Sequence, residues 1–254
     1  MPLELDPFHR ELTFMAPLSE ARGARLCDFV AANARGTVVD AGCGWAELLI
    51  RVLEAAPKIQ GLGIDLDADA VAHGQALARE RGVADRISLI VGDVKAHLPE
   101  AAGAVLCIGA SQIWGPPVEA RQPLDYRSAL EAIRALLQPG APAVYGEGIW
   151  TATPTPEAMA PLANRVDEYL FLPDLLDTVR DCGFVVVRAH QATLDEWDAF
   201  ESGFTARCAR WLGKHPADHP DAAAVRARML AQSNAYFRGY RGVLGMAYLE
   251  LLAV

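Results

Sequence analysis

Short apolar runs recur along the chain, and segments with helical spacing of apolar residues separate the first five of them. The runs of strand length lie at 37–42, 61–66, 87–93, 104–110, 141–149, 184–192 and 243–252. Apolar residues repeat at helical spacing in 48–53, in 68–81 and in 130–137, where "QPG" follows and ends the pattern. Alternating strands and helices, with strands that are apolar throughout, predict a doubly wound α/β fold whose mostly parallel sheet is covered on both faces.

The segment 194–240 departs from this alternation. It is a long stretch of helical character with tryptophans and charged residues, and it separates the last two strand candidates. We interpret it as a helical cap inserted at the edge of the sheet, within one domain that spans 37–254.

Composition restricts the classes of partner. The net charge of −9 disfavours a nucleic-acid backbone or an anionic membrane surface, and no apolar run approaches the roughly 20 residues that cross a bilayer. The N-terminus lacks the pattern of a signal peptide. The five cysteines are odd in number and form no CxxC pair, which predicts a cytoplasmic protein with free thiols. Prolines flank the histidines of "HPADHP", so we expect a turn there and no metal site.

A glycine pair stands where the first strand must give way to a helix, in "TVVDAGCGWAELL". Gly42 and Gly44 allow a tight turn and let backbone N–H groups approach a ligand closely. In doubly wound sheets the first strand–helix turn borders the ligand site. The turn therefore predicts a binding site, although a tight loop without a ligand would need the same glycines.

Acidic residues follow the next two strands in order. Asp65 ends "GLGID" about 20 residues after the turn, where a carboxylate can accept both ribose hydroxyls of an adenosine, with Leu66 beside it. Asp93 ends "IVGD", where an acid can accept a hydrogen bond from an adenine amino group. The fourth strand ends in small residues, "LCIGAS". This ordered set of residues predicts an adenosine site across the strand ends.

Glu47 distinguishes between adenosine cofactors. A dinucleotide-binding turn has Gly or Ala at this position, with the pyrophosphate on the helix N-terminus. A carboxylate there opposes a diphosphate and favours a cationic ligand. S-adenosylmethionine carries a sulfonium and an ammonium group and no phosphate, so the residues favour it over NAD.

The motif "VVDAGCGWAE" resembles the first motif of class I S-adenosylmethionine-dependent methyltransferases, D-x-G-x-G-x-G, with Ala46 at the last glycine. "GIDLD", "VGDV" and "LLQPG" are similar to later motifs of that superfamily, in the same order. The resemblance covers roughly 37–150 and implies a Rossmann-like sheet of seven strands with a reversed last strand. The motif "CIGASQIWG" with "GEGIW" is similar to a subgroup of bacterial methyltransferases of the small-molecule type. In that subgroup a histidine often stands at the position of Gln112, so a histidine base is not expected here.

The resemblance implies a set of cofactor-binding residues. The first motif would hold the methionine portion, Asp65 the ribose, and Asp93 the adenine. The full set is Asp40, Gly42, Cys43, Gly44, Glu47, Asp65, Leu66, Asp93, Val94, Cys107, Ile108 and Gly109, and the two cysteines are expected to contribute through their backbone.

Substrate would approach above the ends of strands four and five. Glu147 is the first candidate for a general base, with Gln112 beside the site, although Glu147 would equally serve as a salt bridge or cap to the next loop. Trp114 and Trp150 could enclose an aromatic or cationic substrate, or pack beneath a loop. Tyr236, Tyr240 and Arg241 could bind a substrate carboxylate, but we favour a role in anchoring the cap.

In such enzymes N-terminal helices often cover the cofactor, so 1–36 is expected to form a helical lid. His9, Phe14 and Met15 are its candidate contacts, with Phe14 also a substrate-binding candidate. The sequence thus predicts a methyltransferase for a small-molecule nucleophile, working by in-line displacement as a monomer or homodimer without metal. An NAD-dependent oxidoreductase and a non-catalytic S-adenosylmethionine-binding protein remain the alternatives.

Overall fold

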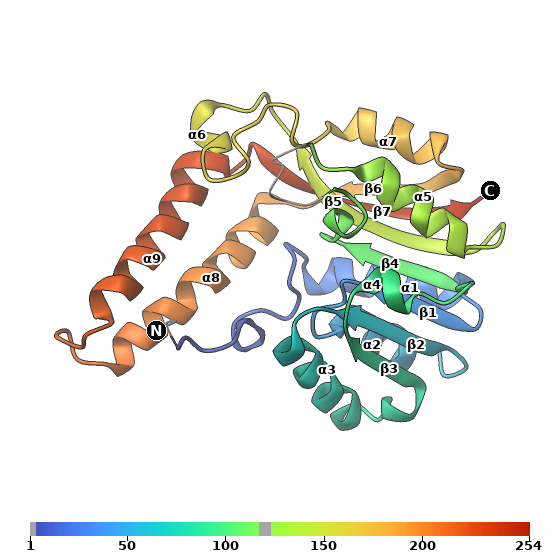
Figure 1. Ribbon diagram of the computed structural model, residues 1–254, viewed down its shortest axis with the longest axis horizontal. Helices are drawn as coiled ribbons and strands as arrows, with labels where there is room; N and C mark the ends of the chain where they lie inside the picture. The colour runs from blue at the N-terminus through green and yellow to red at the C-terminus, as the bar shows by residue number, and fades with distance from the viewer. Residues whose placement is uncertain (1–3, 117–122) are drawn as a thin grey trace.

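The computed structural model describes residues 4–116 and 123–254, and a seven-stranded sheet forms its centre (Figure 1). The strands are β1 (Thr37–Ala41), β2 (Gln60–Asp65), β3 (Ile87–Val91), β4 (Ala104–Ile108), β5 (Pro142–Trp150), β6 (Phe184–Gln191) and β7 (Leu244–Ala253). Their order in the sheet is β3-β2-β1-β4-β5-β7-β6, and β7 runs antiparallel to both of its neighbours. The predicted Rossmann-like fold with a reversed last strand is therefore confirmed.

Helices cover both faces of this sheet. They are α1 (Glu20–Asn33), α2 (Glu47–Ala55), α3 (Ala68–Glu80), α4 (Val94–His97), α5 (Tyr126–Leu136), α6 (Pro156–Met159), α7 (Leu172–Asp181), α8 (Leu194–Lys214) and α9 (Ala222–Asn234). Short 3-10 helices occupy η1 (Phe8–Arg10), η2 (Ala84–Arg86) and η3 (Ser111–Ile113), and a π-helix, η5, spans Ala235–Tyr240.

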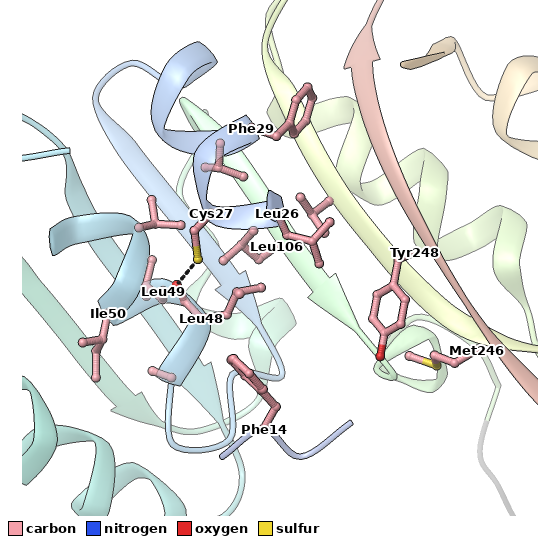
Figure 2. Packing of buried hydrophobic residues seen from close by; sticks show 14 of the residues in the cluster. Phe14, Leu26, Cys27, Phe29, Leu48, Leu49, Ile50, Leu106, Met246 and Tyr248 are labelled. Atoms are coloured by element: carbon pink, nitrogen blue, oxygen red, sulfur yellow. Dashed lines mark hydrogen bonds between the residues drawn. The ribbon is translucent and has the colours of Figure 1, made fainter. Parts of the chain in front are cut away.

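Two apolar cores lie on opposite sides of the sheet, because successive side chains of a strand point to opposite faces. Val38 packs with α1 and α2 on one face, whereas the next residue, Val39, packs with α5 and α7 on the other. Figure 2 shows the first core, where Leu26 and Cys27 of α1 meet Leu48 and Leu49 of α2. The apolar strand sequences are explained by this burial on both faces.

The cap consists of two helices that lie side by side. In Figure 1, α8 and α9 project from the sheet as a pair, and the π-helix leads from α9 back to β7. The stretch predicted as one helical insertion is thus interrupted at residues 215–221, where two prolines stand. At the start of α8, Thr193 and Glu196 form a reciprocal capping box.

The N-terminal part is helical only in places. Helix α1 packs against α2, whereas residues 11–19, which we call the strap, contain neither helix nor strand. We expected a helical lid over the strand ends. The residues that reach the strand ends belong instead to the strap, which is not helical.

Candidate functional site

A cavity of about 530 Å³ opens at the carboxyl ends of β1, β2, β3 and β4. Strands β1 and β4 are neighbours from which the chain proceeds toward opposite edges of the sheet, and ligands of open α/β sheets bind at such a switch point. The lining comprises Phe14, Met15, Ala16, Leu18, Asp40, Gly42, Cys43, Gly44, Trp45, Glu47, Leu48, Asp65, Leu66, Asp93, Val94, Lys95, Ile108, Gly109, Ala110, Gln112 and Ile113. Its volume lies within the usual range of small-molecule sites.

The glycine turn between β1 and α2 forms the floor of this cavity. Gly42 and Gly44 have φ angles of +74° and +53°, which a side chain rarely adopts. A Cβ at Gly42 would lie 2.7 Å from the Cβ of Ala110, whereas a Cβ at Gly44 would meet no atom within 4 Å. Close packing therefore requires the first glycine, and the second leaves its backbone open to a ligand.

The last position of the motif also has a left-handed backbone. Ala46 has a φ of +58° directly before α2, and no side chain caps the first N–H groups of that helix. A left-handed conformation costs a non-glycine residue roughly 1–2 kcal/mol. The geometry explains why glycine suits this position and shows that alanine also adopts it.

Asp40, at the end of β1, is the most perturbed carboxyl group of the cavity. Burial, with a further contribution from the charge of Asp65, raises its pKa to about 8. The side chain is 7% exposed and accepts no hydrogen bond from the residues that the structure describes. A carboxylate in such a place is stabilised by a cation, so the site fits a positively charged ligand.

The two other strand-end carboxylates are already partly engaged. Asp65 accepts hydrogen bonds from the N–H groups of Gly44, at 2.7 Å, and of Asp67, at 2.9 Å. Asp93 caps α4 by accepting from the N–H of Lys95 at 2.9 Å. Each carboxylate oxygen can accept more than one hydrogen bond, so both groups retain capacity for a ligand hydroxyl or amino group.

Glu47 lines the cavity, but its charge is compensated within the chain. Its Oε1 accepts hydrogen bonds from Arg51 at 2.5 Å and from Arg81 at 2.8 Å. The sequence suggested that this charge attracts a cationic ligand. In the structure the unpaired carboxyl is that of Asp40.

The other predicted cofactor contacts divide into two groups. Cys43, Leu66, Val94, Ile108 and Gly109 line the cavity. Cys107 does not, because its side chain is fully buried in the core that faces α5 and α7. Strand alternation explains this placement, since Leu106 and Ile108 point to the opposite face from Cys107.

Glu147 lies behind the cavity wall and is not one of its lining residues. Its carboxylate accepts from the N–H of Ser111 at 3.0 Å and from the N–H of Gly148 at 2.8 Å. Burial raises its pKa, and the side chain is 6% exposed. This arrangement ties the end of β5 to η3, which presents Gln112 and Ile113 to the cavity.

The predicted aromatic substrate contacts lie outside the cavity, except for Phe14. Trp150 is buried and donates from Nε1 to the carbonyl of Val166 at 2.8 Å, and Trp114, which directly follows η3, packs against the core on the face of α5 and α7. Tyr236 and Arg241 both bind the carboxylate of Asp198 on α8.

Tyr240 makes an equivalent contact one turn further along α8. Its hydroxyl donates to Glu201 at 2.8 Å. Together with Tyr236 and Arg241 it fastens the π-helix to α8, in agreement with the anchoring interpretation.

Trp45 is a cavity residue that the sequence did not reveal. Its indole Nε1 donates to the carbonyl of Thr13 at 2.9 Å, so the glycine turn is joined directly to the strap. His9 stacks on His73 of α3 with ring centroids 3.6 Å apart, which holds the chain just before the strap against the sheet domain. In the sequence, the only sign of the contact between Trp45 and Thr13 is that a tryptophan stands within the glycine motif.

Comparison with known proteins agrees with this geometry. A family model described as a methyltransferase domain matches residues 38–140. The crystal structure of an S-adenosylmethionine-dependent methyltransferase from Geobacter sulfurreducens, in complex with S-adenosyl-L-homocysteine, superposes with a TM-score of 0.83 at 28% identity, covering 97% of this chain and 96% of that one. The corresponding complex from Thiobacillus denitrificans gives a TM-score of 0.81 at 28% identity, with coverage of 97% and 96%.

A methyltransferase domain thus occupies residues 38–140, and nearly the whole chain is similar to S-adenosylmethionine-dependent methyltransferases. A further relative is the uncharacterized protein YjhP of Escherichia coli, which is 28% identical over 240 residues, 93% of this chain and 92% of that protein. This methyltransferase contains, among its described residues, no helix long and apolar enough to cross a membrane.

Proposed function

We propose that this methyltransferase transfers the methyl group of S-adenosylmethionine to a nucleophilic atom of a small molecule. The observation that carries the proposal is the cavity at the switch point, where the open glycine turn meets the unpaired carboxyl of Asp40. An anionic pocket of this size suits a cofactor that carries positive charge and no phosphate. The relatives from Geobacter sulfurreducens and Thiobacillus denitrificans, with S-adenosyl-L-homocysteine bound, support this choice.

The cofactor assignment follows the motifs. Asp40 with the glycine turn would hold the methionine portion, and Asp65 the ribose hydroxyls. Asp93, with Val94, would bind the adenine. This order agrees with the sequence of strand ends along the cavity, from β1 through β2 to β3. Gly44 has the open backbone that close approach of the ligand requires.

When bound, the cofactor would supply an electrophilic methyl group. The lone pair of the acceptor would form the new bond to this carbon, while the electron pair of the broken carbon–sulfur bond stays on sulfur. Asp40 contributes a carboxylate that a neighbouring cation keeps ionised. The η3 turn, held from behind by Glu147, fixes the wall that carries Gln112. Holding two reactants in line can contribute on the order of 7–11 kcal/mol, which makes positioning the main task of these residues.

Two features support a small acceptor in a reducing compartment. The strap covers the cavity directly through four of its residues, which leaves less room for an extended macromolecular substrate than an open groove would. All five cysteines are unpaired, which supports a cytoplasmic location.

Calorimetric titration with S-adenosyl-L-homocysteine and, separately, with NAD tests the cofactor. We expect binding of the first compound only, and we expect Asp65→Ala to weaken it by at least about tenfold, since a bidentate hydrogen-bonding carboxylate is lost. Asp69→Asn, at an exposed position of α3 outside the cavity, is the control. Unchanged affinity of the Asp65 variant would contradict the ribose assignment.

Methyl transfer itself is tested with S-adenosylmethionine labelled in the methyl group and a cell extract. We expect the label in the small-molecule fraction. Label confined to the protein or RNA fraction would contradict the proposed acceptor class and leave the cofactor assignment intact.

A further inference from the structure

A second cavity, of about 480 Å³, lies on the other side of the strap, between it and the start of α8. Phe14, Ala16 and Leu18 line both this cavity and the one at the strand ends. Ligands in the two cavities would therefore be separated by the strap alone. In Figure 1 the blue N-terminal segment runs between α8 and the strand ends.

The strap is fastened on both sides of this shared wall. Trp45 binds the carbonyl of Thr13 from the glycine turn, and the hydroxyl of Tyr248 in β7 donates to the carbonyl of Pro17 at 3.0 Å. At its end, the N–H and hydroxyl of Ser19 donate to Glu196 of α8. The shared wall thus has a fixed position relative to the glycine turn, the sheet and the cap.

The second cavity has a predominantly acidic lining. Its charged residues are Glu11, Glu20, Asp195 and Glu196, against the single cation Arg22. Three of the four carboxylates are already neutralised: Arg22 binds Glu196 at 2.8 Å, Arg51 binds Glu20, and Arg210 binds Glu11.

Asp195 is the remaining carboxylate. It has no ion pair and accepts no side-chain hydrogen bond within residues 4–116 and 123–254. It stands in the first turn of α8, exposed at the rim of the cavity. A cationic group of an occupant would find its counter-charge at this residue.

The rest of the lining is apolar or carries a hydroxyl. Leu12, Phe14, Leu18, Ala199 and Phe200 provide the apolar surface. An occupant that complements both parts has an apolar body and a positively charged end. The lining disfavours a carboxylate or phosphate end group, because its single cation, Arg22, is already paired with Glu196 through Nε and Nη2.

We propose that this second cavity is a binding site for a small amine with an apolar body, separate from the cavity at the strand ends and divided from it by the strap. Asp195 binds the ammonium end, and Phe14 and Phe200 contact the apolar body.

Three probes with the same apolar body test the charge preference: 2-phenylethylamine, 2-phenylethanol and phenylacetate. Each is titrated calorimetrically into the protein with and without saturating S-adenosyl-L-homocysteine. We expect the amine to bind at least about tenfold more tightly than phenylacetate, with the alcohol between them, since only the amine gains from Asp195. Equal affinities, tighter binding of phenylacetate, or no binding of any probe would overturn the proposal.

Two variants locate the binding. Asp195→Asn should weaken the amine about threefold to fivefold, as expected for an exposed ion pair, and should leave the alcohol unchanged. Asp69→Asn removes an equivalent charge from the first turn of α3 and is the matched control. Ala199→Trp fills the cavity from an exposed position and should abolish amine binding while S-adenosyl-L-homocysteine binds as before.

Amine binding that both variants leave unchanged would overturn the proposal. Failure of the wild type to bind S-adenosyl-L-homocysteine would contradict the proposed function instead. The titrations without that ligand still decide whether the second cavity takes the amine.

Discussion

The raised pKa of the buried Asp40 carboxyl predicts how protein stability and cofactor binding depend on pH. An acid whose pKa is raised in the folded state stabilises that state only at low pH. The contribution is fully present below the ordinary pKa of 3.8 and is lost as the pH rises toward about 8. Between these limits the folded protein binds one proton more than the unfolded chain. Replacing Asp40 with the neutral, similarly sized asparagine removes this proton.

The magnitude follows from the linkage relation. One extra bound proton in the folded state lowers the free energy of unfolding by about 1.4 kcal/mol for each pH unit of increase. At pH 7, keeping a carboxyl of ordinary pKa 3.8 protonated costs about 4 kcal/mol, which is the upper limit of what Asp40→Asn can recover. The pH slope is the sharper quantity, since it depends on the proton count alone.

Urea denaturation of the ligand-free protein at pH 5, 6 and 7 measures this slope for the wild type and for Asp40→Asn. We expect the variant to gain about 1.4 kcal/mol relative to the wild type for each pH unit. Asp28→Asn, an exposed position on α1, is the control and should run parallel to the wild type. Parallel curves for Asp40→Asn and the wild type would refute the assignment of a raised pKa to this group.

The same group links cofactor binding to proton release. A cationic ligand beside Asp40 lowers its pKa, so binding of S-adenosyl-L-homocysteine at pH 7 should release up to about one proton from the wild type. Calorimetry in two buffers of different ionisation enthalpy counts the protons. Asp40→Asn should bind more weakly and release none through this group, and equal release by both proteins would place the cation elsewhere.

Four further substitutions test the site and its supports. Gly42→Ala and Gly44→Ala impose a similar backbone strain, but only the new Cβ at position 42 meets the Cβ of Ala110, at 2.7 Å. We therefore expect Gly42→Ala to lower the free energy of unfolding, measured by urea denaturation, by about 1–3 kcal/mol more than Gly44→Ala does. Equal losses would contradict the packing argument. Glu196→Ala leaves a buried guanidinium unpaired and should lower the free energy of unfolding by about 3–5 kcal/mol, against almost no change for exposed Glu80→Ala. Although burial opposes ionisation of Glu196, hydrogen bonds from Arg22 and Ser19 bring its pKa down to about 2. Its contribution to the free energy of unfolding should therefore disappear as the pH falls from 4.5 toward 2. A contribution that persists at pH 2 would refute this assignment. Glu147→Gln keeps only one of the two carboxylate oxygens that accept hydrogen bonds from Ser111 and Gly148. We expect this change to raise the KM for the cofactor about tenfold without changing the shape of the kcat–pH profile. Loss of the acidic limb of that profile would instead support Glu147 as a general base.

The sequence alone predicted the sheet, its approximate strand boundaries and the position of the cavity that we propose holds the cofactor. Strands buried on both faces must be apolar throughout, and a turn with a left-handed backbone favours glycine, so the sequence shows both features locally. The carboxylates Asp40, Asp65 and Asp93 follow strands in order, and parallel strands bring their ends to one edge of the sheet. Because of this topology, cavity residues could be predicted from their spacing in the sequence.

The tertiary structure decided which of the remaining polar and aromatic residues face a cavity. Glu147 and Trp150 stand at a strand end in the sequence, yet both are buried behind the wall, because burial depends on elements that arrive from distant parts of the chain. The charge of Glu47 is neutralised by Arg51, four residues along α2, and by Arg81, which lies 34 residues away, and no local pattern reveals the second pairing. The strap and the second cavity arise only where the N-terminal residues meet α8. The distance between these segments along the chain is about 180 residues, and only folding brings them together.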